Sequence, residues 1–295
     1  MRLLLHHVTE RQLATATETT AGSYVFHGPR GVGKATAARE LARRLNCRGD
    51  EGGDCAHCRQ FEAGAYPDFI WVQPEGRASV TIEQVRQLGH SLTMTPYYAE
   101  GKRLVVIDRA EALTVEAQNA LLKLIEEPPP RTHFVLVAEQ LGALLPTMCS
   151  RLVPIYFAPL PAATIAELLE SQEGLRPVEA TRLAALAAGA PGQARRLATD
   201  PAAAAVLSQL DEAAVMALSA SLFDRLVLAR RLADAKAELP LLAGRLQQSV
   251  LGGLRQGSEL PALAASRLGA LERFRRGLTA NVGARVALER LMLEL

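Results

Sequence analysis

Two segments of this 295-residue chain carry residues with the types and spacing of a nucleotide site. The first, residues 28–35, reads Gly-Pro-Arg-Gly-Val-Gly-Lys-Ala and nearly matches the phosphate-binding loop G-x-x-x-x-G-K-S/T. Its glycines, Gly28, Gly31 and Gly33, allow backbone N–H groups to face phosphate oxygens, and Lys34 adds a positive charge near the outer phosphates. These four residues are candidates for binding a nucleotide.

The second segment, residues 103–108, is an apolar run that ends in Asp108. A buried parallel strand of this kind delivers an acid to the carboxyl edge of a sheet, where Mg²⁺ and phosphates bind in phosphate-loop proteins. Asp108 can hold Mg²⁺ through water. Alternatively it caps neighbouring backbone at the end of the strand, and the sequence leaves both interpretations open.

Two positions depart from a hydrolytic site. The residue after the loop lysine should carry a hydroxyl for Mg²⁺ and is Ala35, while Thr36 lies about 100° further around the helix and cannot replace it. The residue after Asp108 should be an acid that activates water and is Arg109. The loop is therefore expected either to be vestigial or to bind nucleotide without hydrolysing it, and hydrolysis is the least favoured of the three alternatives.

Ser150 and Arg151 form a further candidate, at the end of the link between two expected strands. An arginine on the edge of such a domain can reach a neighbouring subunit and stabilise the charge that develops on a γ-phosphate. Such an arginine finger is typically worth roughly 10³–10⁵ in rate. A lone arginine is more commonly a solvated surface residue, but the surrounding pattern favours the finger.

Three cysteines form a candidate zinc site. Cys55-Ala56-His57-Cys58 is a short knuckle of the kind that holds Zn²⁺, and Cys47 is close enough to supply a third thiolate in the glycine-rich loop after the first core helix. A closed structural site needs four ligands, and His57 is expected to point away from the metal. Reduced, metal-free thiols are the equal alternative. Cys149 stands apart and is expected to be a small, half-buried residue.

The elements that must position these residues belong to an α/β core. Short apolar runs alternate with helical patterns, which predicts a parallel sheet flanked by helices. Thr81 and Thr114 are expected to cap helices, and Pro128 to Pro130 to end one. Strands are predicted near 23–28, 68–72, 104–108, 133–138 and 153–157, and helices near 33–45, 81–92 and 114–126.

After Pro159 and Pro161 the chain becomes rich in Ala, Leu, Arg and Glu at helical spacing. We expect an α/β core at 1–160, a small helical lid at 161–203 and an all-helical collar at 204–295. Breaks are expected at the segment 189–192, at an Asp200-Pro201 linker, and near Pro240, Gly252-Gly253 and Pro261.

Composition favours a soluble globular protein, with 49% hydrophobic and 22% charged residues. A net charge of +2 provides no global attraction to DNA or to an anionic membrane. No continuous apolar run approaches the roughly 18 residues of a membrane span. Four cysteines do not make a disulfide framework, so a reducing cytoplasm is expected and no membrane partner.

These residues together resemble the delta-prime subunit family of the bacterial DNA polymerase III clamp loader, an AAA+ relative of the gamma/tau motor subunits. The resemblance spans the chain, although 160–275 matches only in helical texture. It rests on 55–59, 65–68, 107–113, 119–129, 144–147 with Ser150 and Arg151, and Asn281 with 287–291.

The resemblance implies roles for particular residues. The family's Ser-Arg-Cys motif carries the arginine finger and maps onto Ser150 and Arg151, with Leu152 in place of the cysteine. The family's zinc module has four cysteines, and the fourth falls on Phe61. The motor subunits also carry an arginine in the lid, which aligns with Gly192.

The resemblance therefore implies a subunit without a competent ATPase site of its own. It would act as a stator that presents Arg151 to a neighbour's ATP beside the gamma/tau motor subunits and the clamp-opening delta subunit. The complex would load the sliding clamp onto primed DNA, and the collar would hold the ring together. The alternatives are a gamma/tau-like motor ATPase and a stand-alone nucleotide-binding switch.

Overall fold

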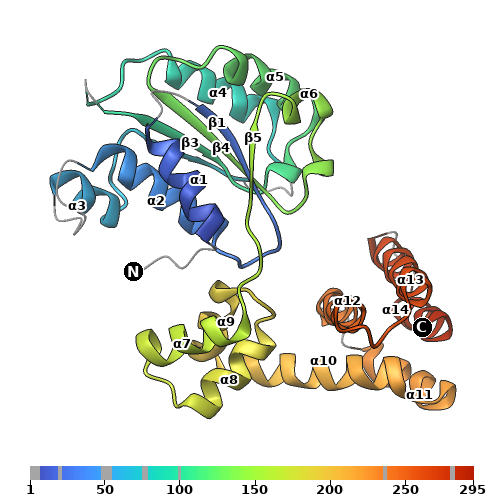
Figure 1. Ribbon diagram of the computed structural model, residues 1–295. Helices are drawn as coiled ribbons and strands as arrows, with labels where there is room; N and C mark the ends of the chain where they lie inside the picture. The colour runs from blue at the N-terminus through green and yellow to red at the C-terminus, as the bar shows by residue number, and fades with distance from the viewer. Residues whose placement is uncertain are drawn as a thin grey trace. The chain divides into compact units, whose positions relative to one another are not determined.

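The computed structural model describes residues 7–18, 22–47, 55–74, 79–98, 101–234, 238–279 and 283–295. Backbone contacts divide the chain into two compact units (Figure 1). The first comprises 1–168 with 189–193, and the second comprises 169–188 with 194–295. The finer division into a core, a lid and a collar stays a prediction.

A five-stranded parallel sheet forms the centre of the first unit, in the order β2-β3-β4-β1-β5. All five predicted strands are confirmed to within two residues. Their bounds are Gly22–His27 for β1, Phe69–Val72 for β2, Arg103–Ile107 for β3, Thr132–Ala138 for β4 and Val153–Tyr156 for β5. Because every strand runs the same way, the segments that follow them meet at one edge.

Helices cover both faces of this sheet (Figure 1). Alternate side chains of β3 point to opposite faces, as the pleat requires. Val105 and Ile107 join the core with α4 (Ile82–Leu92), α5 (Val115–Glu126) and α6 (Pro146–Cys149). Leu104 and Val106 join the core with α1 (His7–Glu18) and α2 (Lys34–Asn46). Helices α1 and α6 had not been expected.

The helix starts follow the expected capping chemistry. The Thr81 side chain accepts from the backbone of Gln84, whose own side chain accepts from the Thr81 N–H, so α4 begins with a complete capping box. The Thr114 hydroxyl accepts from Ala117 N at 3.2 Å and caps α5. Helix α5 ends at Glu126, before the predicted proline stop.

A buried ion pair supports the β2 side of the sheet and was missed by the sequence reasoning. Arg103 Nε lies 3.7 Å from Asp68 Oδ1, and both side chains are nearly inaccessible to solvent. Asp68 also accepts from the backbone N–H groups of Tyr97 and Tyr98, while Arg103 donates to the carbonyl of Met94. These bonds satisfy two buried charges and fix the loop after α4.

The second unit is helical, as predicted. Its helices include α8 (Pro177–Leu186), α10 (Pro201–Ser219), α11 (Leu222–Leu232), α12 (Leu239–Gln256), α13 (Pro261–Thr279) and α14 (Ala284–Glu294). Two further helices, α7 (Ala162–Glu173) and α9 (Pro191–Thr199), cross the division between the units. Leu242, Leu246, Phe274 and Leu288 lie in the common core of α10 to α14. Asn281 lies outside the described residues.

The expected break at Asp200-Pro201 is confirmed, since α9 ends at Thr199 and α10 begins at Pro201. The link is a single residue, Asp200, which is the N-cap of α10 and accepts from Ala203 N at 3.0 Å. The expected break at Gly252-Gly253 is wrong. Helix α12 continues through Gly252 and Gly253 and ends at Gly257, which adopts φ 72°. A glycine accepts this left-handed conformation without the steric cost that other residues incur. The breaks at Pro240 and Pro261 are confirmed, since each lies in the first turn of a helix.

Helix α10 is long and apolar enough to cross a membrane by length and composition, and it is the one such helix in the described part of the chain. The sequence analysis did not single out this helix, because Asp211 and Glu212 interrupt its apolar run. The test is weak, since core helices pass it too, and Leu207, Leu210 and Ala214 of α10 are buried among the other helices.

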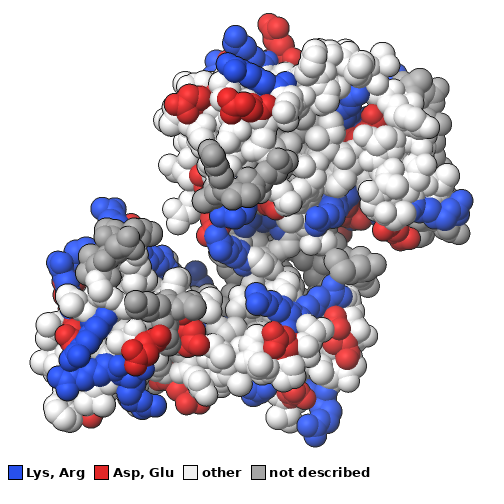
Figure 2. Space-filling model, turned by 180° about the vertical axis from the view of Figure 1, so that it is seen from behind, with Lys and Arg blue, Asp and Glu red and all other residues white. Residues whose placement is uncertain are grey.

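Charged side chains are mixed over the visible face of both units (Figure 2). Many arginines of the described residues belong to local ion pairs, such as Arg276 with Glu272 and Arg285 with Glu289. The pairs fit the small net charge and leave no large single-sign patch on the face shown.

Candidate functional site

The phosphate-like loop joins β1 to α2 and adopts backbone conformations that need glycine. Gly28, Gly31 and Gly33 have φ of 140°, 77° and 98°. A Cβ at Gly28 would lie 2.3 Å from the carbonyl oxygen of Phe157. The loop therefore follows a strand and opens a helix, as the motif requires.

A cavity of about 420 Å³ lies beside this loop. Its lining brings together Lys34, Asp108 and the three departures inferred from the sequence, Ala35, Arg109 and Gly192. The Gly192 N–H donates to Gly31 O at 3.0 Å, so this residue contacts the loop directly. Ala35, Arg109 and Gly192, the expected departures from a motor site, thus line one pocket. Gly28 is not among the described residues that line it.

The loop lysine makes its hydrogen bonds within the loop. Lys34 Nζ donates to Gly28 O at 2.5 Å and to Pro29 O at 2.6 Å, and the side chain is 7% exposed. Burial lowers the pKa of Lys34, while nearby Glu139 and Glu111 partly offset this effect.

Three charged residues of the pocket were missed by the sequence reasoning. Arg30, which lies in the loop, pairs through Nε with Glu139 directly after β4. Glu111 lies in the short helix η1 (Ala110–Ala112) that follows Asp108. Arg30 follows β1, Glu111 follows β3 and Glu139 follows β4. These positions could have suggested them, because segments that follow parallel strands share one edge of the sheet.

Arg151 lies outside this pocket, at the junction of α6 and β5. It is not among the described residues that line the loop's cavity. Its Nε pairs with Glu126 at the end of α5, and its Nη1 donates to Thr147 O at 2.9 Å and to Ser150 Oγ at 3.2 Å. The Arg151 side chain is 42% exposed. We refer to Glu126, Thr147, Ser150 and Arg151 as the arginine corner.

A buried glutamine holds the segment that leads to this corner. The Gln118 side chain, on α5, accepts from Leu145 N at 2.8 Å, directly before Pro146 starts α6. Arg151 N donates to Met148 O at 3.0 Å, so α6 turns directly into the corner. Helix α5 therefore contacts the Ser150-Arg151 motif, although the two are distant in sequence.

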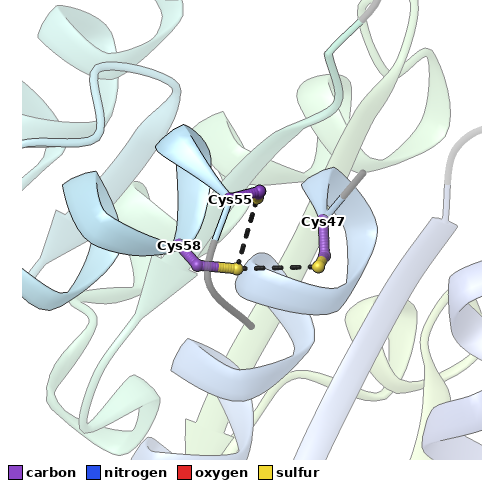
Figure 3. Close-up of side chains that lie close together, drawn as sticks. All are labelled: Cys47, Cys55 and Cys58. Atoms are coloured by element: carbon purple, nitrogen blue, oxygen red, sulfur yellow. Dashed lines mark hydrogen bonds between the residues drawn. The ribbon is translucent and has the colours of Figure 1, made fainter. Parts of the chain in front are cut away.

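The three candidate zinc ligands lie together (Figure 3). Their Sγ atoms are all within 4.8 Å of one another, with 3.5 Å between Cys55 and Cys58 and 3.6 Å between Cys58 and Cys47. Cys58 belongs to helix α3 (Ala56–Glu62), where a loop had been expected, and Cys47 and Cys55 flank α2 and α3.

Among the described residues, the candidate zinc site has three ligands, all of them cysteine sulfurs. His57 Nδ1 lies 2.8 Å from Asn46 O, and Phe61 stacks on Tyr66 at a centroid distance of 4.0 Å. Arg43 Nη1 donates to Cys58 Sγ at 3.6 Å. Burial raises the pKa of the Cys58 thiol, and the hydrogen bond from Arg43 opposes that rise. Cys149, the last residue of α6, is half-buried against the core, as predicted.

Comparison with known proteins decides the family. Residues 6–161, more than half of the chain, match the protein family described as DNA polymerase III, delta subunit. The chain belongs to this family. The expected resemblance to delta-prime subunits is confirmed by curated relatives of that name.

The delta-prime subunit of Pseudomonas aeruginosa is 37% identical over 184 residues, which cover 60% of this chain and 56% of the relative. That of Bacillus subtilis is 35% identical over 178 residues, covering 59% and 51%. The tau subunit of Escherichia coli is 32% identical over 264 residues, covering 85% and 39%. The chain thus spans about half the length of the delta-prime relatives it matches.

Solved structures support the fold. A DNA polymerase III gamma subunit-related protein from Thermotoga maritima superposes with a TM-score of 0.52 at 18% identity and covers 97% of both chains. RuvB of Thermotoga maritima superposes with a TM-score of 0.50 at 16% identity, covering 66% of this chain and 60% of that one. The predicted AAA+ phosphate-loop core with a helical second part is confirmed.

Proposed function

We propose that this chain is a non-hydrolysing stator subunit of the DNA polymerase III clamp loader. It would supply Arg151 as an arginine finger to ATP bound by a neighbouring gamma/tau motor subunit. The observation that carries the proposal is the lining of the chain's own pocket, where Ala35, Arg109 and Gly192 replace three working parts of a motor site.

The chemistry of the pocket supports the loss of hydrolysis. Without a hydroxyl at position 35, Mg²⁺ would lose one of its protein ligands, and Asp108 alone would hold it weakly. Arg109 cannot accept a proton from water. Lys34 is bonded to loop carbonyls, so a phosphate would have to displace contacts that already exist.

The chemistry of the arginine corner supports action on a neighbour. Arg151 is partly exposed, and its partners are a carboxylate, a hydroxyl and a carbonyl. Phosphate oxygens are also strong acceptors for a guanidinium and can replace such partners. The proposed assembly includes the delta subunit, the sliding clamp and primed DNA, in the cytoplasm.

The test is ATP turnover, stimulated by DNA and clamp, of a reconstituted loader that carries substitutions in this chain alone. Arg151→Ala is expected to lower turnover by at least about 10³-fold at the site it serves. Arg86→Ala, at an exposed arginine of α4, is the matched control and should leave turnover unchanged.

Lys34→Ala separates the stator from a motor. It should be nearly silent, because the pocket of this chain is not the site of hydrolysis. Loss of loading with Lys34→Ala would establish a motor ATPase instead, and unchanged turnover with Arg151→Ala would show that the corner is only structural.

We further propose that Cys47, Cys55 and Cys58 hold Zn²⁺. A tetrahedral ion with Zn–S bonds of about 2.3 Å separates its thiolates by about 3.8 Å. The sulfur distances of 3.5 and 3.6 Å fit this requirement. Three thiolates and Zn²⁺ carry a net charge of −1, which the Arg43 guanidinium beside Cys58 can balance.

The zinc proposal is tested with Co²⁺, whose thiolate complexes absorb in the near ultraviolet. The full chain should develop this absorption, Cys58→Ser should lose it, and Cys149→Ser should retain it. No absorption in the unsubstituted chain, or equal loss with Cys149→Ser, would exclude the site. Circular dichroism reports whether each variant is folded.

A further inference from the structure

Glu139 contacts the phosphate-like loop in two ways. Its backbone carbonyl accepts from Gly28 N at 3.3 Å. Its carboxylate pairs with Arg30 Nε, and this hydrogen bond raises the pKa of Arg30 while burial opposes the rise. Both side chains line the cavity beside the loop. Glu139 thus lies where the loop would otherwise face a bound anion.

Two of the three cations that line the pocket, Arg30 and Lys34, already face carboxylates. Glu139 and Glu111 both interact electrostatically with Arg30 and with Lys34. One carboxylate oxygen of Glu111 is buried and has no hydrogen-bond partner among the described residues. With Asp108, the pocket contains three acids.

Three acids in one pocket repel a polyphosphate unless a cation lies between them. In a motor site Mg²⁺ has that role, and the hydroxyl after the loop lysine helps to hold it. Here that position is Ala35, so the repulsion has no such compensation. The ion pair itself contributes little, because the Arg30 side chain is 75% exposed and exposed pairs are weak.

We propose that Glu139 is a specificity-determining residue. Its carboxylate lies beside the cations of the loop and excludes nucleoside polyphosphates from this pocket. The proposal rests on the proposed non-hydrolysing role and extends it, because it assigns the exclusion to one carboxylate. The carboxylate acts by its charge rather than by tethering Arg30.

Two matched substitutions separate charge from tethering. Glu139→Gln and Arg30→Gln both break the same ion pair, but only the first removes the negative charge. Binding of a fluorescent ADP analogue to the isolated full chain is measured with Mg²⁺ and with EDTA. Glu116→Gln, at an exposed acid in the first turn of α5, is the control for a general change in charge.

Glu139→Gln is expected to bind the analogue at least about tenfold more tightly than the unsubstituted chain, since it removes one like charge close to the phosphates. The gain should disappear when Lys34→Ala is added. Arg30→Gln and Glu116→Gln should show no gain. Thermal melting confirms folding, and Glu139→Ala serves if Glu139→Gln does not fold.

Three results would overturn the proposal. In the first, the unsubstituted chain binds the analogue as tightly as Glu139→Gln. In the second, the gain persists when Lys34→Ala is added to Glu139→Gln. In the third, Arg30→Gln gains as much as Glu139→Gln. The binding assay uses no partner subunit. Its failure is therefore distinct from failure of the stator role, which is read from turnover of the assembled loader with Arg151→Ala.

Discussion

The α/β unit contains two arginine–glutamate pairs with the same chemistry and different surroundings. Arg30 pairs with Glu139 at a cavity that also contains a buried lysine and two more acids. Arg151 pairs with Glu126 at a partly exposed corner, where its other partners are a hydroxyl and a backbone carbonyl. A phosphate entering the first site meets competing carboxylates, whereas a phosphate reaching the second displaces one.

Under the proposed stator role, this difference explains how one domain could lose its own nucleotide chemistry and still serve that of a neighbour. The departures at 35, 109 and 192 change the pocket and leave α5, α6 and the corner intact. Gln118 of α5 holds the segment that leads to the arginine corner. No residue of α5 is among the described residues that line the pocket. The two sites can therefore change independently.

The largest effect expected from this comparison is at Arg151. Arg151→Lys keeps the charge but loses the planar fork that binds two phosphate oxygens at once. We expect turnover at the neighbouring site that Arg151 serves to fall by about 10²-fold or more. Arg86→Lys is the matched control. Full turnover with Arg151→Lys would show that any positive charge suffices at the corner.

A smaller effect is expected at the partner of Arg151. Glu126→Gln removes the carboxylate that competes with a neighbour's phosphate. Because a partly exposed ion pair contributes about 0–1 kcal/mol, turnover should rise by no more than about fivefold. Glu127→Gln, at the adjacent exposed acid, should have no effect. A fall in turnover with Glu126→Gln would mean that this pair holds the finger in its working position.

The fold could be predicted because its signals are local. The five apolar strands, the caps at Thr81 and Thr114 and the stop after Glu126 all depend on near neighbours in sequence. Helix α1 was missed because it contains three threonines, which have low helix propensity, and few large apolar residues. The break expected at Gly252-Gly253 was wrong because packing of α12 in the helical core outweighs the low helix propensity of glycine.

The candidate site could be predicted only in part. The loop, Asp108 and the three cysteines are visible as motifs with short spacing. Glu139 and Arg30 are 109 residues apart, and their pairing depends on the order of β1 and β4 in the sheet, which no local pattern specifies. The same holds for Glu126 and Arg151, whose contact depends on how α5 and α6 pack.

The smallest effect tests whether the loop lysine is adapted to an empty pocket. Burial lowers the pKa of Lys34 from 10.5, so between that lowered pKa and 10.5 the unfolded chain binds more protons than the folded chain. The free energy of unfolding should therefore rise with pH in this window. Urea unfolding at pH 8 and pH 10 should show this rise, and Lys34→Met should lack it. Lys123→Met, at an exposed lysine of α5, should keep it. Equal pH dependence in Lys34→Met and the unsubstituted chain would mean that Lys34 is solvated, and the pocket would then resemble the arginine corner more closely than its burial indicates.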